Sequence, residues 1–113
     1  MKIERFDKGP RMSRIVVHGE TIYLSGIVGS GEGITEQTTS MLAMVDKRLA
    51  EVGSNKSKIL SAIVWVATMD DFSEMNVVWD AWIDPENPPT RACGEARLAR
   101  DVLLVEVIII AAK

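Results

Sequence analysis

Apolar residues along this chain follow two spacings, and each spacing predicts a different kind of element. Recurrence every three to four residues predicts two helices, whereas β-branched, alternating or continuous apolar runs predict five strands. The expected elements, in chain order, are strands over 14–18 and 21–25, a helix over 38–52, a strand over 59–69, a helix over 72–83, and strands over 91–98 and 102–112. This order, ββαβαββ, indicates an α+β fold in a single domain over residues 1–113.

The ends of the helices carry recognisable signals. Thr35 is expected to cap the first helix and Gly53 to end it. The second helix is expected to begin with a box-like start at Asp71 and Glu74, with Asp in place of Ser or Thr.

The strands over 59–69 and 102–112 are apolar on both sides, so both faces of the sheet need cover. Two helices can cover one face of a sheet of this size. A chain of 113 residues has nothing left for the other face. Further copies of the subunit are therefore expected to cover it.

Composition narrows the classes of partner and compartment. The net charge is −3 and no cluster of Lys or Arg is long enough to follow a nucleic-acid backbone, so no nucleic-acid partner is expected. Cys93 is the only cysteine, which excludes an internal disulfide and favours a reducing compartment. The N-terminus lacks a signal-peptide core, and the C-terminal apolar run is too short for a membrane helix. A cytoplasmic protein without a membrane partner is expected.

Glu106 is a lone carboxylate in an otherwise apolar run, where burial is costly unless a positive or hydrogen-bonding group meets it. Alternation along the strand predicts that it shares a side with Val102, Leu104, Ile108 and Ile110. Arg91 is the nearest obvious candidate for that group in the sequence. Such a pair could anchor a small carboxylated ligand and activate a water molecule. It could also be only a structural ion pair. Arg91 could equally be a surface residue at a strand start, with or without an ion pair to a loop. Backbone amides or Arg97 could equally satisfy Glu106.

Four further residues are candidates for a binding site. Cys93 should point the same way as Arg91, roughly 7 Å along the strand, and is either a reactive thiol or a small buried apolar residue. Ser25, before Gly26 at a strand end, could offer a hydroxyl to a ligand or serve the turn alone. Asn76 is unfavourable within a helix, which is a mild functional indication unless the side chain faces solvent.

One cysteine and one histidine far apart form no metal site.

Several motifs together resemble the RidA (YjgF-like) family of enamine/imine deaminases. The run from Thr90 to Leu98, followed by Asp101-Val102 and Val105-Glu106-Val107, resembles the C-terminal signature of that family. Gly9-Pro10, Ser25-Gly26 and the stretch 70–76 resemble its early Gly-Pro, its strand end and its helix start, and stretches 53–57 and 79–82 resemble the YoaB-type branch. The likeness covers nearly the whole chain. The chain departs from it at Arg11-Met12, where well-studied members carry a Tyr, and at Ile27 and Ala99.

The resemblance implies a chorismate-mutase-like, RidA-like sheet in a homotrimer, with ligand sites in clefts between subunits. It implies hydrolysis of reactive 2-imino acids to 2-oxo acids and ammonia without a cofactor. By that likeness Arg91 binds the substrate carboxylate, Glu106 positions or activates the attacking water, and Ser25, Gly26, Asn76 and Cys93 line the pocket. The missing Tyr keeps open an alternative, a non-catalytic trimer that binds small carboxylic acids. A protein-interaction role, suggested by the apolar strands and six methionines, ranks third.

Overall fold

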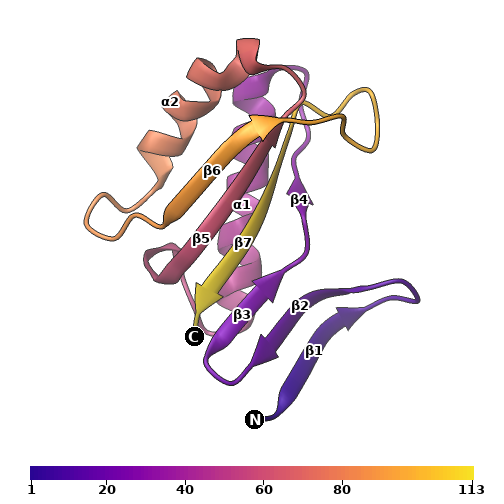
Figure 1. Ribbon diagram of the computed structural model, residues 1–113, viewed down its shortest axis with the longest axis vertical. Coiled ribbons are helices and arrows are strands. Elements are labelled where there is room, and N and C mark those ends of the chain that lie inside the picture. Colours follow the sequence, from indigo (N-terminus) through magenta and orange to yellow (C-terminus); the bar gives the residue numbers. More distant parts are fainter.

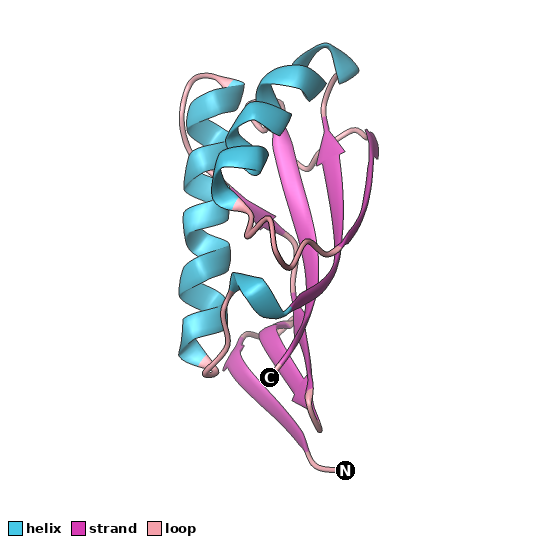
Figure 2. Ribbon diagram, turned by 90° about the vertical axis from the view of Figure 1, so that its left-hand side faces the viewer, coloured by secondary structure: helices cyan, strands magenta, loops and turns pink.

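A computed structural model describes all 113 residues and folds them into one sheet with two helices on a single face (Figures 1 and 2). The strands are β1 (Ile3–Lys8), β2 (Ser13–His18), β3 (Thr21–Leu24), β4 (Ile27–Val28), β5 (Ile59–Val66), β6 (Thr90–Glu95) and β7 (Val105–Ala112). The helices are α1 (Ile34–Glu51) and α2 (Phe72–Trp82), with short 3-10 turns at Lys56–Lys58 and Met69–Asp71. The predicted α+β fold with both helices on one face is confirmed, and every predicted helix and strand is present in the predicted order.

The order of strands in the sheet is β1-β2-β3-β7-β5-β6, and β4 also pairs with β7. Paired strands run antiparallel except β5 and β6, which are parallel. A parallel pair needs a crossover connection, and α2 supplies it between β5 and β6 (Figure 1). This topology leaves β6 at one edge of the sheet and β7 in its middle.

The structure adds two strands to the prediction. Strand β1 is mostly exposed and pairs only with β2. Because it buries neither face, its sequence shows no apolar alternation that could have predicted a strand. Its charged residues suit an unpaired edge of the sheet. Strand β4 has only two residues. The strands at the C-terminus are shorter than predicted, because β6 ends at Glu95 and β7 begins at Val105. Between them the Gln37 side chain bonds the Val102 carbonyl oxygen and the Leu104 N–H, and the Leu104 carbonyl oxygen accepts from the Ala67 N–H just beyond β5.

The predicted helix ends are partly wrong. Helix α1 is capped at Gly33 and not at Thr35, and the Glu36 carboxylate accepts a hydrogen bond of 3.0 Å from the Gly33 N–H. Gly53 follows α1 with a φ of 76°, the left-handed conformation that ends helices, as predicted. Asp71 precedes α2, but its side chain makes no capping bond because a 3-10 turn already sets its backbone in a helical conformation.

The core lies between the helices and one face of the sheet. Every second residue of β7 faces α1 and α2, in accordance with the period of two along a strand. The buried apolar residues include Ile15, Val17, Ile22, Leu24, Met41, Leu42, Val45, Leu49, Val64, Val66, Met75, Val105, Val107 and Ile109. Burial of these side chains fixes the register of the central strands, because a shift of one residue would turn them all outward.

The opposite face of the sheet, here called the open face, is apolar and has no cover within the chain (Figure 2). Tyr23 is 44% exposed and Ile63 is 37% exposed, and Ile108 and Ile110 are half-buried. A contiguous apolar surface of this kind indicates an interaction site. Neither helix combines the length and apolarity needed to cross a membrane.

Candidate functional site

Arg91 lies on the side of the sheet that α2 covers. In the parallel ladder it pairs with Ala62, which is buried beneath the helices, and its guanidinium carbon stands 5.1 Å from the centre of the Trp79 ring on α2. A guanidinium over an indole face is favourable and keeps its hydrogen-bonding edge free. This stacking holds the half-buried Arg91 side chain in place without using its donors.

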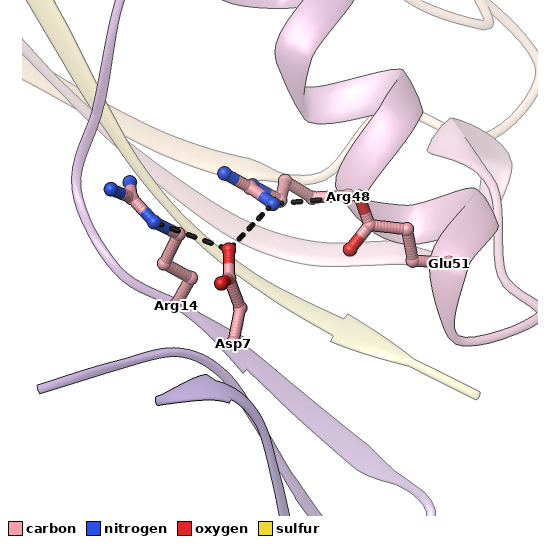
Figure 3. Close-up of polar contacts among 4 residues, drawn as sticks. All are labelled: Asp7, Arg14, Arg48 and Glu51. Carbon is pink, nitrogen blue, oxygen red and sulfur yellow. Dashed lines mark hydrogen bonds and ion pairs between the residues drawn. The ribbon is translucent and has the colours of Figure 1, made fainter. Parts of the chain in front are cut away.

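No carboxylate of the chain pairs with Arg91. The ion pairs join Asp7 to Arg14 and Arg48, and Arg48 to Glu51, between strand β1, strand β2 and the end of helix α1 (Figure 3). A half-buried guanidinium with free donors is suited to bind an external carboxylate through two parallel hydrogen bonds. The interpretations of Arg91 as part of a loop ion pair, or as the ion-pair partner of Glu106 within one chain, are wrong.

The loop before β6 is fixed by Asp84. Its carboxylate accepts hydrogen bonds from Asn87 Nδ2 (3.0 Å), Ser57 Oγ (2.7 Å) and the Glu86 N–H (2.9 Å). The bonds from Asn87 and Ser57 are the main causes that lower the pKa of Asp84 from its ordinary value of 3.8. The carboxylate therefore stays charged at neutral pH and anchors the segment that leads to Arg91.

Cys93 shares the side of Arg91, as predicted, since it pairs with the buried Val64. Burial raises the pKa of the Cys93 thiol above its ordinary value of 9.0, and the nearby Arg91 charge only partly offsets this effect. The thiol is therefore protonated at neutral pH. This favours the interpretation of Cys93 as a small half-buried residue lining a site over that of an activated nucleophile.

We expect alkylation of Cys93 by iodoacetamide to be slow at neutral pH and to keep accelerating above pH 9.0, because only the thiolate reacts. The measurement is the alkylation rate against pH, with the unfolded protein as the reference thiol. The position of the inflection reports the pKa, whereas poor access lowers the rate at every pH alike. An inflection below that of the unfolded protein would restore the reactive-thiol interpretation.

Asn76 lies on α2 one turn before Trp79, on the same side of the helix. Its amide oxygen is buried and has no hydrogen-bond partner within the chain. The interpretation of a solvent-facing side chain is therefore wrong for this atom. A buried acceptor without a partner is rare in folded proteins, which marks Asn76 as an unusual position. Asn76, Trp79, Arg91 and Cys93 are called the Arg91 half-site below.

Glu106 lies on the open face with Ile108 and Ile110, as predicted. The prediction that Val102 and Leu104 continue this side is wrong, because both precede β7 and Leu104 packs against the core. Its carboxylate makes no ion pair or hydrogen bond within the chain and lies against Gly26, where an added Cβ would collide with Glu106 Oε2. The interpretation that Arg97 or backbone amides satisfy Glu106 is therefore wrong for the single chain.

Ser25 and Gly26 follow β3 beside Glu106. The Ser25 N–H donates to the Arg14 carbonyl oxygen at 3.0 Å, which holds this turn against β2. Ser25 continues the alternation that places Tyr23 on the open face. Ser25, Gly26 and Glu106 are called the Glu106 half-site below.

The two half-sites lie on opposite faces of the sheet. Arg91 pairs with Ala62 of β5, and Glu106 pairs with Trp65 of the same strand. Three residues along β5 and two strand spacings across place their Cα atoms about 14 Å apart, before the opposite directions of the side chains are added. The expectation that adjoining segments of one chain bring Arg91 and Glu106 into one crevice is therefore wrong. One cleft can contain both side chains only if they come from two copies.

Two hollows in the surface of the single chain lie away from both half-sites. One of about 650 Å³ is formed by the β1–β2 hairpin and contains Arg11 and Met12, and one of about 380 Å³ lies along the loop 96–103. Neither is lined by Arg91 or Glu106. This agrees with two half-sites that each form one wall of a larger cleft.

Trp79 is the residue of the Arg91 half-site that the sequence did not assign to ligand binding. Its position on the apolar stripe of α2 predicts a core residue, and it is indeed buried. Its contact with Arg91 depends on the crossover that lays α2 over β6, which no local pattern reveals. The sequence signal for this contact is an aromatic residue on the crossover helix, Trp79, followed by an arginine on the next strand, Arg91.

Comparison with known proteins supplies the family. The family model described as Endoribonuclease L-PSP matches residues 3–113. A RutC family protein of Haemophilus influenzae is 40% identical over 114 residues, covering 98% of each chain. The RutC family protein YoaB of Escherichia coli is 39% identical over 113 residues, covering 99% of each chain. A YjgF-family protein of Neisseria meningitidis has a crystal structure that superimposes with a TM-score of 0.98 at 46% identity, covering 100% of this chain and 96% of that one. The chain therefore belongs to the Endoribonuclease L-PSP family, whose members are also named YjgF or RutC proteins.

Proposed function

We propose that this protein hydrolyses reactive 2-imino acids to 2-oxo acids and ammonia, in a trimer whose sites lie between subunits. The observation that carries the proposal is the half-buried Arg91 guanidinium, which lies over Trp79 and has no carboxylate partner in its own chain. A small anionic acid would supply that partner through two parallel hydrogen bonds. The resemblance of the residues around Arg91 to the imine deaminases supplies the reaction.

Assembly would bring the two half-sites together. The open face carries Tyr23, Ile63 and Ile108 beside the Glu106 half-site, and its apolar surface gains cover when a second copy packs on it. In a ring of three copies each subunit meets its neighbours through two different surfaces. One surface would present the Arg91 half-site and the other the Glu106 half-site, so that every interface holds one complete cleft.

The reaction in such a cleft needs orientation and proton transfer. Arg91 would hold the carboxylate of the 2-imino acid, so that the protonated imine carbon faces Glu106 of the neighbouring copy. Glu106 would accept a proton from water as the water oxygen forms a bond to that carbon. Glu106 would return that proton to the nitrogen, and the carbon–nitrogen bond would break as the new hydroxyl oxygen forms the carbonyl. The hydroxyl proton would pass to the departing ammonia, so that a protonated imine gives a 2-oxo acid and ammonium. One water molecule is consumed and no electron is gained or lost.

The charge of the segment that leads up to Arg91 argues against a polyanionic substrate. From Ala67 to Pro89 the sequence holds six carboxylate residues, Asp70, Asp71, Glu74, Asp80, Asp84 and Glu86, and neither Lys nor Arg. The net charge of the whole chain is −3. A nucleic acid would be repelled by this region, whereas a small acid with one carboxylate can reach a single guanidinium.

The test is the release of ammonia and 2-oxo acid from 2-iminopropanoate or 2-iminobutanoate generated in the cuvette. Acceleration above the buffer rate, in proportion to the concentration of folded protein, would support the proposal. Saturable binding of 2-oxobutanoate in calorimetry without any acceleration would instead support the alternative, a trimer that binds small carboxylic acids without catalysis. Absence of both would remove both functions.

Gly26→Ala should lower kcat about tenfold or more while changing stability little, because the new Cβ displaces the flexible end of Glu106 and no backbone. The measurements are imine hydrolysis and the thermal unfolding midpoint. Gly9→Ala is the matched control, since a Cβ there meets only the Met12 carbonyl oxygen, at an ordinary 3.7 Å. Unchanged kcat in Gly26→Ala would contradict the role of Glu106.

A further inference from the structure

The buried amide of Gln37 bonds two separate backbone segments. Gln37 lies on α1 and is only 3% exposed. Its Nε2 donates to the carbonyl oxygens of Gly31 (3.0 Å) and Val102 (2.8 Å), and its Oε1 accepts from the Leu104 N–H (2.8 Å). Both donor hydrogens and the acceptor are thus engaged, so the side chain is held in one orientation.

The two segments are those that flank the Glu106 half-site. Leu104 directly precedes β7. Gly31 belongs to the segment 29–33 that follows β4, here called the glycine-rich segment because it holds Gly29, Gly31 and Gly33. Strands β4 and β7 pair with Val28 opposite Glu106, two residues after Gly26. The position of Glu106 relative to Gly26 therefore depends on how these segments are held against each other.

The glycine-rich segment lies close against α1. A Cβ on Gly29 would collide with the backbone carbonyl of Gln37, so only glycine allows this approach. Gly31 has a φ of 136°, which side chains other than glycine's rarely permit. Gly29 and Gly31 belong to no phosphate-binding fingerprint. Their presence is explained by the close approach of this segment to α1, which lets Gln37 reach Gly31.

We propose that Gln37 is a positioning residue, which fixes the Glu106 carboxylate for its work on water. The inference rests on the proposed function and adds a residue that touches no substrate. Loss of the amide would leave two carbonyl oxygens and one N–H without these partners at a partly buried site. The segment 102–104 would then move to find other partners and carry the start of β7 with it. A displacement of about 1 Å at a catalytic group can cost about 100-fold in rate.

The test compares Gln37→Met with Ser40→Ala. Methionine keeps the length and volume of glutamine without its hydrogen bonds. Ser40 Oγ accepts a 3.0 Å hydrogen bond from the Ser30 N–H of the same glycine-rich segment but does not touch residues 102–104. We expect Gln37→Met to lower kcat about tenfold or more with KM changed less than about threefold, because Arg91 lies on the other face of the sheet. Ser40→Ala should keep both constants.

Two further measurements separate positioning from a general loss of structure. Gln37→Glu should regain part of its kcat relative to the parent protein as pH falls, since a protonated carboxyl can donate one hydrogen bond and accept another. The 13C chemical shift of the Glu106 side-chain carboxyl should change in Gln37→Met and stay constant in Ser40→Ala. This shift can be read even if the protein hydrolyses no imine, so failure of the proposed function stays distinguishable. A rise in KM as large as the fall in kcat, or an unchanged chemical shift of the Glu106 carboxyl in Gln37→Met, would overturn the inference.

Discussion

Arg91→Ala is expected to lower kcat/KM for 2-imino acids by at least about 100-fold, or about 2.7 kcal/mol, and to leave the oligomer intact. The loss follows because two charge-assisted hydrogen bonds to the substrate carboxylate disappear together. Within the chain Arg91 gives up only its stacking on Trp79, a contact of about 0.5–2 kcal/mol for a half-buried cation. Steady-state kinetics and the molar mass in solution are the measurements.

Two variants make the Arg91 result specific. Arg91→Lys keeps the charge but loses the planar fork, so its kcat/KM should fall between those of the parent protein and Arg91→Ala. Arg97→Ala removes an exposed arginine from the loop beyond β6 and should behave as the parent does. Activity that survives in Arg91→Ala, or falls equally in Arg97→Ala, would refute a substrate-binding role for Arg91.

The sequence predicted the local features of both half-sites. Alternation along β6 places Arg91 and Cys93 on one side, and alternation along β7 places Glu106 with Ile108 and Ile110, and the structure confirms both. These predictions hold because the period of two along a strand is a local property of the backbone. The neighbouring residues alone determine which side chains share a side.

The relation between the two half-sites was beyond the sequence pattern. Strands β6 and β7 are consecutive, yet β5 lies between them, and one is parallel and the other antiparallel to it. Only this long-range order shows that Arg91 and Glu106 face opposite ways. Gln37 was a different case, because a signal existed. It occupies the buried stripe of α1 with Ile34 and Met41, where a polar amide needs partners.

Mixed oligomers that contain Arg91→Ala and Glu106→Gln subunits are expected to be active, although oligomers of either variant alone are not. If every cleft takes Arg91 from one copy and Glu106 from its neighbour, a ring of three with both kinds of subunit always contains one cleft with neither change. The other clefts lack one or both groups. Mixed trimers should therefore show about one third of the activity of the unchanged protein, whichever variant is in excess.

The experiment is co-expression of the two variants with different affinity tags, followed by purification over both tags in succession. Each variant co-expressed with a differently tagged copy of itself serves as the control and should stay inactive. The gain cannot come from a site within one chain, because the sheet separates Arg91 from Glu106 and every subunit carries one of the two changes. Mixed trimers as inactive as the trimers of each variant alone would refute the shared cleft. They would also refute the division of the site between the two faces of the sheet.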